Sequence, residues 1–231
     1  MEYRETYYSE ESEIIASDAE NYEEKTLCVF VLDKSLSMRN HDRIGQLNAG
    51  IRRFLQDIRE DTKTARCLEI AIVEFSSQVS ISQPPALVDQ IVFQDLQADG
   101  VTLLVEALET AFSVVEKRKK YYKTLEIPYL RPFVILISDG EPYPPRDLTS
   151  ITTQIYALET QNHLKLMPIA VDESANATLR RICYTPPRLM QEKRFTEFFD
   201  WLGNSMKIVS QKHRGESVKL PPTDGWDTIR L

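Results

Sequence analysis

Apolar runs and amphipathic stretches alternate along most of the chain. Four runs have the length and branched apolar composition of strands buried on both faces, and they span residues 27–33, 68–75, 133–139 and 164–171. Apolar residues at helical spacing predict helices over about 44–59, 104–120, 147–159, 176–183 and 196–211. Strands that alternate with helices in this order predict an α/β fold, with a doubly wound, mostly parallel central sheet and helices on both faces.

Shorter features refine the predicted strands. Residues 79–81 are expected to form a short antiparallel strand that ends at Pro84 and Pro85. A short edge strand is expected to begin at Leu189. Pro168 lies inside a predicted strand and removes a backbone donor, which implies a bulge or pairing on one side only.

The acidic residues are concentrated at the start of the chain. Residues 1–24 hold nine acidic residues and one basic residue, whereas the rest is nearly neutral. We therefore expect an acidic N-terminal arm over 1–24, one domain over 25–211 and a polar tail over 212–231. The arm is expected to be a disordered, solubilising segment; the alternatives are a docking segment for a basic partner or an intramolecular cover for a site. Trp226 is unusual in such a tail and could pin it to the domain or to a partner.

Composition argues against several classes of protein. A nucleic-acid surface needs a basic face, and the basic run 117–120 is instead expected to be a solvated helix terminus, where cations favour the macrodipole. No apolar stretch approaches the roughly 20 residues of a membrane span. Three cysteines are too few for a disulfide framework or a zinc site, and the acidic N-terminus is unlike a signal peptide. We expect a cytoplasmic protein that binds neither nucleic acid nor membrane.

Polar residues gather where two predicted strands end. Asp33 ends the first strand, and Ser35 and Ser37 follow at alternate positions. In a doubly wound sheet the first and fourth strands are neighbours, so Asp139, at the end of the fourth, would meet Asp33 at the carboxyl edge. Thr102 opens the helix that leads to the fourth strand and can reach the same place. These oxygen donors favour Mg²⁺ or Mn²⁺ over zinc, and a cation would offset the repulsion between the two carboxylates.

This pattern resembles the metal-ion-dependent adhesion site of von Willebrand factor A domains, over about residues 27–210. The residues that carry the resemblance are Asp33-Lys-Ser35-Leu-Ser37, Thr102 and Asp139-Gly140. The resemblance implies that the serines and the threonine bind the metal directly and that the aspartates often act through water. It also implies that a carboxylate from a protein partner completes the coordination shell.

A narrower resemblance points to a bacterial intracellular group associated with tellurium resistance. It rests on the loop 99–104, the turn 138–142 and the aromatic stretch 198–202. This resemblance implies a role in a stress-response or signalling assembly.

The sequence departs from the family pattern beside the expected ligands. Leu36 stands between the serines, where the family usually has glycine or another small residue, and it is expected to restrict the loop or cover the metal. Lys34 is also adjacent, although strand alternation should point it away from the cation. Asp172 and Glu173 follow Val171, where the family often has a glycine-rich turn. None of these changes removes a ligand.

We expect a non-enzymatic module that uses Mg²⁺ or Mn²⁺ to capture a Glu or Asp of a protein partner. A Glu from residues 1–24 could occupy the same position and inhibit it. The alternatives are a Mg²⁺-dependent hydrolase on a related sheet, a degenerate scaffold without metal, and an Asp33 that only caps the next helix. The sequence has no glycine-rich phosphate loop and no nucleophile elbow, which argues against the corresponding enzymes.

Overall fold

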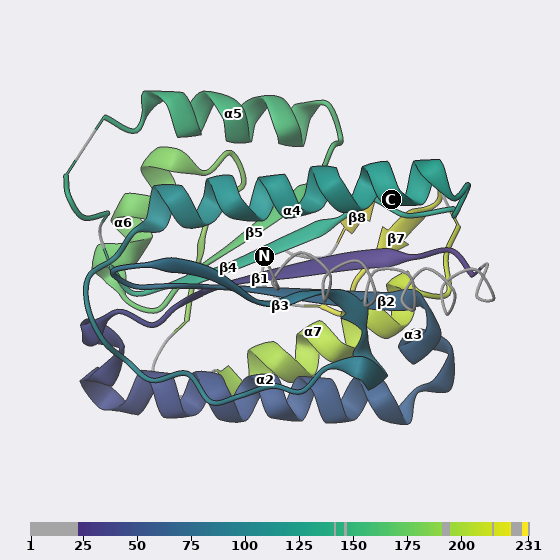
Figure 1. Cartoon of the computed structure of the whole chain (residues 1–231), viewed down its shortest axis with the longest axis horizontal. Coiled ribbons are helices and arrows are strands. Elements are labelled where there is room, and N and C mark those ends of the chain that lie inside the picture. Colours follow the sequence, from purple (N-terminus) through teal and green to yellow (C-terminus); the bar gives the residue numbers. More distant parts are fainter. Residues whose placement is uncertain are drawn as a thin grey trace, which may run out of the picture.

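A six-stranded sheet with helices on both faces forms the centre of the molecule (Figure 1). The computed structural model describes residues 23–140, 142–145, 147–190, 195–213, 215–222 and 228–230. Residues 1–22 and Trp226, on which two of the expectations above rest, lie outside the described residues.

The strands follow the order predicted for a doubly wound sheet. Their bounds are β1 Thr26–Asp33, β2 Leu68–Phe75, β3 Val79–Leu87, β4 Phe133–Ser138, β5 Lys165–Ala170 and β6 Arg188–Leu189. The order across the sheet is β3-β2-β1-β4-β5-β6, and every pair is parallel except β2 with β3. The prediction that the first and fourth strands are neighbours is therefore confirmed.

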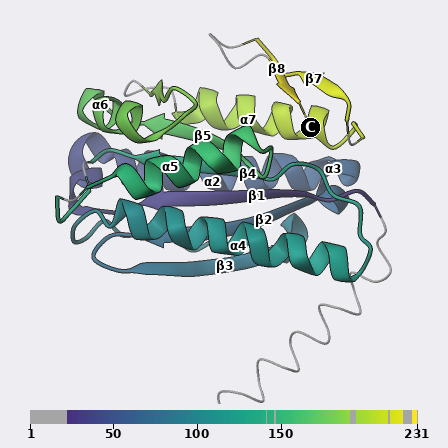
Figure 2. The same cartoon turned by 90° about the horizontal axis from the view of Figure 1, so that it is seen from above.

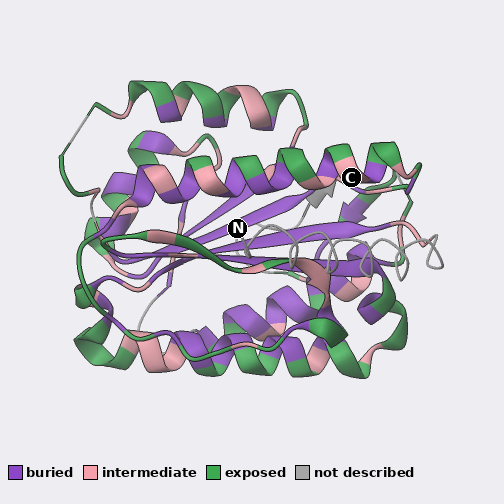
Figure 3. Ribbon diagram, in the orientation of Figure 1, coloured by how far each residue is buried: buried purple, intermediate pink, exposed green. Residues whose placement is uncertain are grey.

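Helices cover both faces of the sheet (Figure 1). One face carries α2 Arg43–Glu60, α3 Thr62–Cys67 and α7 Phe195–Val209, and the other carries α4 Leu104–Thr124, α5 Thr149–Thr160 and α6 Glu173–Ile182. In the described residues, 3₁₀ segments at Leu36–Asp42 and Val88–Gln90 form parts of the connections. Side chains of β1 alternate between the two resulting cores, with Phe30 in the core under α2 and Val29 in the core under α4. Figure 3 shows β1, β2, β4 and β5 as almost wholly buried, whereas the edge strand β3 is exposed or intermediate.

The two proline predictions had different outcomes. β3 continues through Pro84 and Pro85 to Leu87, so the prediction that these prolines end it is wrong. β3 is an antiparallel edge strand (Figure 2), where a missing backbone donor is tolerated, and its register shifts near Ile72. Pro168 keeps continuous register with β4, whereas β6 pairs only with the two residues after it, which is the one-sided pairing expected.

The basic run on α4 is more buried than predicted. Helix α4 continues to Thr124, so Arg118 and Lys119 lie within it rather than at a solvated terminus. Arg118 donates to both carboxylate oxygens of Glu69, at 2.6 and 2.7 Å, and Lys119 is only 7% exposed. The strand acid Glu69 is itself buried, and a buried carboxylate requires such a partner.

The C-terminal segment also differs from a polar tail. It contains β7 Ser217–Lys219, which pairs with β8 Thr228–Arg230. Val218 and Leu220 are buried in the core under α7, and the Trp201 indole donates to the Pro221 carbonyl at 3.0 Å. None of the helices in the described part of the chain combines the length and apolar character that crossing a membrane requires.

Candidate metal centre

The carboxyl edge of the sheet brings the two predicted aspartates together. Asp33 is the last residue of β1, and Asp139 directly follows β4, its parallel neighbour. Their carboxyl groups are connected through the two serines: Ser35 Oγ lies 3.1 Å from Ser37 Oγ, and Ser37 Oγ donates to Asp139 Oδ1 at 2.6 Å. Four of the five predicted site residues therefore form one cluster.

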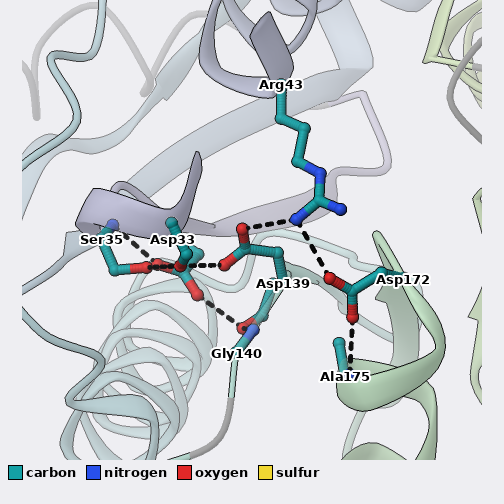
Figure 4. A network of polar contacts seen from close by, with 9 residues as sticks. Asp33, Ser35, Arg43, Asp139, Gly140, Asp172 and Ala175 are labelled. Carbon is teal, nitrogen blue, oxygen red and sulfur yellow. Dashed lines mark hydrogen bonds and ion pairs between the residues drawn. The ribbon is translucent and has the colours of Figure 1, made fainter. Parts of the chain in front are cut away.

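The Asp33 carboxylate is fully buried and is held by neutral donors. The backbone N–H of Ser35 donates to Oδ1 at 2.8 Å (Figure 4). The Ser138 hydroxyl donates to Oδ2 at 2.6 Å. Among the described residues, no cationic side chain pairs with Asp33. Burial raises the pKa of the Asp33 carboxyl to about 6, while the Ser138 and Ser35 hydrogen bonds oppose this rise.

Thr102 reaches the same edge from the loop before α4. Backbone hydrogen bonds hold this loop to the β1 end, since Leu36 N–H donates to Gly100 O at 3.1 Å and Asp99 N–H donates to Lys34 O at 2.8 Å. A Cβ on Gly140 would lie 3.1 Å from Thr102 Oγ1, so glycine allows this hydroxyl to approach closely. Within the described residues, no hydrogen bond joins Thr102 Oγ1 to the other four predicted ligands.

Two further charged residues belong to the cluster and were missed by the sequence analysis. Arg43, the first residue of α2, donates through Nη1 to Asp139 Oδ2 at 2.8 Å and lies 3.0 Å from Asp172 Oδ2 (Figure 4). Asp172 also caps α6, where its Oδ1 accepts from Ala175 N–H at 3.0 Å. A cation in the first turn of a helix is unfavourable because the helix N-terminus is itself positive. The position of Arg43 could therefore have indicated from sequence that it has an acidic partner.

The residues beside the predicted ligands take defined positions. Lys34 Nζ lies 3.6 Å from Glu74 Oε2, away from the cluster, as strand alternation predicts. Leu36 is 51% exposed, so its side chain is largely in solvent rather than packed in the core. His41 is exposed and has a left-handed backbone conformation, with φ 53°. Glu141 lies outside the described residues.

The donor set at this edge fits a hard divalent cation. In the described part of the chain, no group of three or more His, Cys, Asp and Glu side chains is arranged to hold a metal, so a site here depends on hydroxyl oxygens. The cluster supplies two carboxylates and the hydroxyls of Ser35 and Ser37, with Thr102 adjacent. Such an all-oxygen set suits Mg²⁺ or Mn²⁺, and the buried Asp33 charge lacks a cation of its own.

The geometry defines an α/β domain with a polar, partly charged cluster at the switch point of its sheet. Residues 28–141 match the family model described as the von Willebrand factor type A domain. These residues, just under half of the chain, are thus similar to von Willebrand factor A domains.

Several solved structures share this fold. The vWF domain of the type V pili tip protein Mfa5 from Porphyromonas gingivalis is 13% identical, with a TM-score of 0.58, covering 87% of this chain and 99% of that one. The ArnB paralog VWA2 from Sulfolobus acidocaldarius is 21% identical, with a TM-score of 0.53 and coverages of 79% and 45%. The pilus adhesin SpaC from Lactobacillus rhamnosus GG is 12% identical, with a TM-score of 0.60 and coverages of 79% and 30%.

These similarities extend to the fold alone, because every one of these identities is below 25%. The chain spans less than half the length of the archaeal and Lactobacillus proteins. No curated protein sequence matches the chain.

Proposed function

We propose that this domain is a protein-binding module that depends on Mg²⁺ or Mn²⁺ and captures an acidic side chain of its partner. The proposal rests on the environment of the Asp33 carboxylate. It is fully buried and, among the described residues, accepts hydrogen bonds from neutral donors and pairs with no cation. Burying an unpaired charge is costly, so a fold that retains one at a ligand-binding edge has a use for it.

Five side chains would hold the cation: Asp33, Ser35, Ser37, Thr102 and Asp139. When bound, a divalent cation would supply Lewis acidity toward an incoming carboxylate. The serine and threonine hydroxyls carry no formal charge, so they add oxygen donors without lowering the positive charge that attracts a Glu or Asp.

Arg43 limits how much negative charge the cluster presents. Its guanidinium is shared between Asp139 and Asp172, so Asp139 is already partly neutralised on Oδ2. The other oxygen, Oδ1, faces Ser37 and the ligand cluster. Asp33 is thus the principal acid of the cluster that no side chain neutralises. One such acid favours binding of a divalent cation, and it leaves that cation enough positive charge to attract an acidic partner.

Three broader features of this proposal rest on the sequence and its resemblances. We propose that the module acts inside the cell and is not an enzyme, and that it belongs to a bacterial stress-response or signalling assembly of the tellurium-resistance type. The alternatives remain a Mg²⁺-dependent hydrolase and a scaffold that binds no metal.

Capture of partner proteins from a lysate, with and without chelator, tests the proposal. The expected result is a protein retained by the wild-type chain in Mg²⁺ and released by chelator, and lost with Asp33→Ala or Asp139→Ala. Glu74→Gln is the matched control, because Glu74 lies at the same edge but pairs with Lys34. Partner capture that persists in chelator and in both aspartate variants would refute cation dependence.

A second assay separates the enzymatic alternative. The purified chain is incubated with a generic phosphate ester and Mg²⁺, and Asp33→Asn is assayed beside it. We expect no turnover by either protein. Turnover by wild type that is lost in Asp33→Asn would favour the hydrolase.

A further inference from the structure

A cavity of about 660 Å³ lies at the edge of the sheet opposite Asp33 and Asp139. Its walls come from the last turns of α4, the segment before β4, the turn between α5 and β5, and residues 215 and 217. These segments adjoin the amino ends of β4 and β5, on the side where α4 ends (Figure 1). The volume falls within the range of small-molecule sites, roughly 300–1,000 Å³.

The cavity carries excess positive charge. Lys119, Lys123 and Arg131 line it, together with His163. Glu116 accepts from Lys119 Nζ at 2.9 Å and lies 3.7 Å from His163 Nδ1. Within the described ranges, Lys123 forms no ion pair and Arg131 contacts no carboxylate. Three permanent cations therefore face one contacting carboxylate, and the nearby Glu159 carboxylate is paired with Lys165, which leaves about two positive charges uncompensated.

Arg131 is held in place by backbone carbonyls rather than by an acid. Its Nε donates to Leu164 O at 2.8 Å, and its Nη2 donates to Glu159 O at 2.8 Å. The Glu159 carboxylate binds Lys165 Nζ at 3.1 Å and Thr185 Oγ1 at 2.9 Å instead. Burial lowers the pKa of the Arg131 guanidinium, and the nearby Glu159 carboxylate opposes this. The guanidinium is thus positioned before any ligand arrives, which reduces the entropy lost on binding.

Stabilisation of α4 does not account for this arrangement. A cation in the last turn of a helix favours the macrodipole, and this explains Lys123. It does not explain Arg131, which precedes β4, or the burial of Lys119. The cations converge from separate elements on one hollow, as expected for a binding site.

We propose that this cavity binds the phosphate group of a soluble small molecule. A phosphate monoester carries about two negative charges at neutral pH, which matches the two uncompensated positive charges. Arginine provides a planar fork of donors for phosphate oxygens, and lysine provides a mobile charge. The site is separate from the candidate metal centre and does not depend on it.

Titration calorimetry of the full chain with pyrophosphate, in buffer without divalent cations, tests this proposal. Lys123→Gln should weaken binding about tenfold, the effect of losing one charge-assisted hydrogen bond. Lys120→Gln is the matched control, because Lys120 is exposed on the same helix and does not line the cavity. It should weaken binding less than about twofold, since it removes only screened long-range attraction.

Two outcomes would overturn the proposal: no binding of pyrophosphate at millimolar concentration, or equal weakening by Lys120→Gln and Lys123→Gln. Arg131→Gln should also abolish binding, with thermal unfolding as a check on its fold. If that variant does not fold, the comparison of Lys120→Gln with Lys123→Gln still tests the proposal.

Asp33→Asn should bind pyrophosphate like wild type, which separates this site from the metal centre. Sedimentation with phosphatidic acid vesicles, without binding of free pyrophosphate, would contradict a soluble ligand.

Discussion

Two buried carboxylates on neighbouring strands are satisfied in different ways. Glu69, near the start of β2, is 1% exposed and accepts from Arg118 and from the Tyr122 hydroxyl at 2.6 Å. Asp33, at the end of β1, is 0% exposed, and its hydrogen-bond donors within the described residues are serine N–H and hydroxyl groups. Both acids lie in the same sheet, but only Glu69 is paired with a cation from the chain.

This difference separates a structural buried acid from a candidate ligand. Glu69 and Arg118 compensate each other at the amino end of the sheet, so nothing further is needed there. Asp33 lies at the carboxyl edge, where no cationic side chain from the described part of the chain pairs with it and serine dipoles support its charge. Substitution of Glu69 should therefore damage the fold, and substitution of Asp33 should damage cation binding.

The largest expected effect is that of Glu69→Gln on folding. The neutral amide removes the ion pair between the buried Glu69 and Arg118, whose side chain is only 10% exposed, and this should lower the free energy of unfolding by about 3–5 kcal/mol. Urea denaturation measures this loss. The double variant Glu69→Gln/Arg118→Met should recover part of it, and a Glu69→Gln protein as stable as wild type would contradict the structural role.

Adding a divalent cation should stabilise the wild-type chain. At a Mg²⁺ concentration 100 times the dissociation constant, the expected gain is about 2.7 kcal/mol, because the cation binds the folded state alone. Thermal unfolding with Mg²⁺ or chelator measures it. Asp33→Asn should show no such gain; an equal gain in that variant would place the effect elsewhere.

In chelator, Asp33→Asn should change the free energy of unfolding by less than about 1.5 kcal/mol, and toward greater stability. The amide keeps an acceptor for Ser35 N–H and removes a buried charge that has no cation partner. Urea denaturation beside Glu69→Gln gives the comparison directly. A loss as large as that of Glu69→Gln would make Asp33 a structural acid as well.

The smallest expected effect is that of Arg43→Met on cation affinity. Removing a fixed positive charge beside Asp139 should tighten Mn²⁺ binding by about fivefold, since a partly exposed pair near the surface is worth about 1 kcal/mol. Calorimetry measures the change, with Arg39→Met as a control, because Arg39 binds the Ala98 carbonyl outside the cluster. Weaker binding by Arg43→Met would mean that Arg43 positions Asp139 for the cation.

Much of the sheet and the candidate ligand cluster could be predicted from sequence. Long apolar runs with helical stretches between them identified β1 and β4 as neighbours, and the aspartates follow directly from the ends of those strands. Ser35 and Ser37 followed because they are local to Asp33 in the chain. These features depend on period and topology, which a single sequence carries.

Long-range side-chain pairing could not be predicted in the same way. Arg43 reaches Asp139 across 96 positions, and Arg118 reaches Glu69 across 49. Each pair forms only when the helix is rotated so that its arginine faces the sheet. The local sequence around either residue does not determine that rotation. The sequence did not predict the second half of β3, beyond Pro84, or the strand β7 after Gly215. In both places, pairing with a neighbouring strand and burial outweigh the low intrinsic strand propensity of the residues.

Titration of the full chain with Mn²⁺ measures whether Asp33 is a metal ligand. The wild-type chain should bind one Mn²⁺ ion. Asp33→Asn should bind it at least about 100-fold more weakly, because mutating even the residues that support metal ligands lowers metal affinity by about 10–100-fold. Glu74→Gln, an acid paired with Lys34 at the same edge, should bind nearly as wild type does. No binding by wild type at millimolar Mn²⁺, or unchanged binding by Asp33→Asn, would contradict the account.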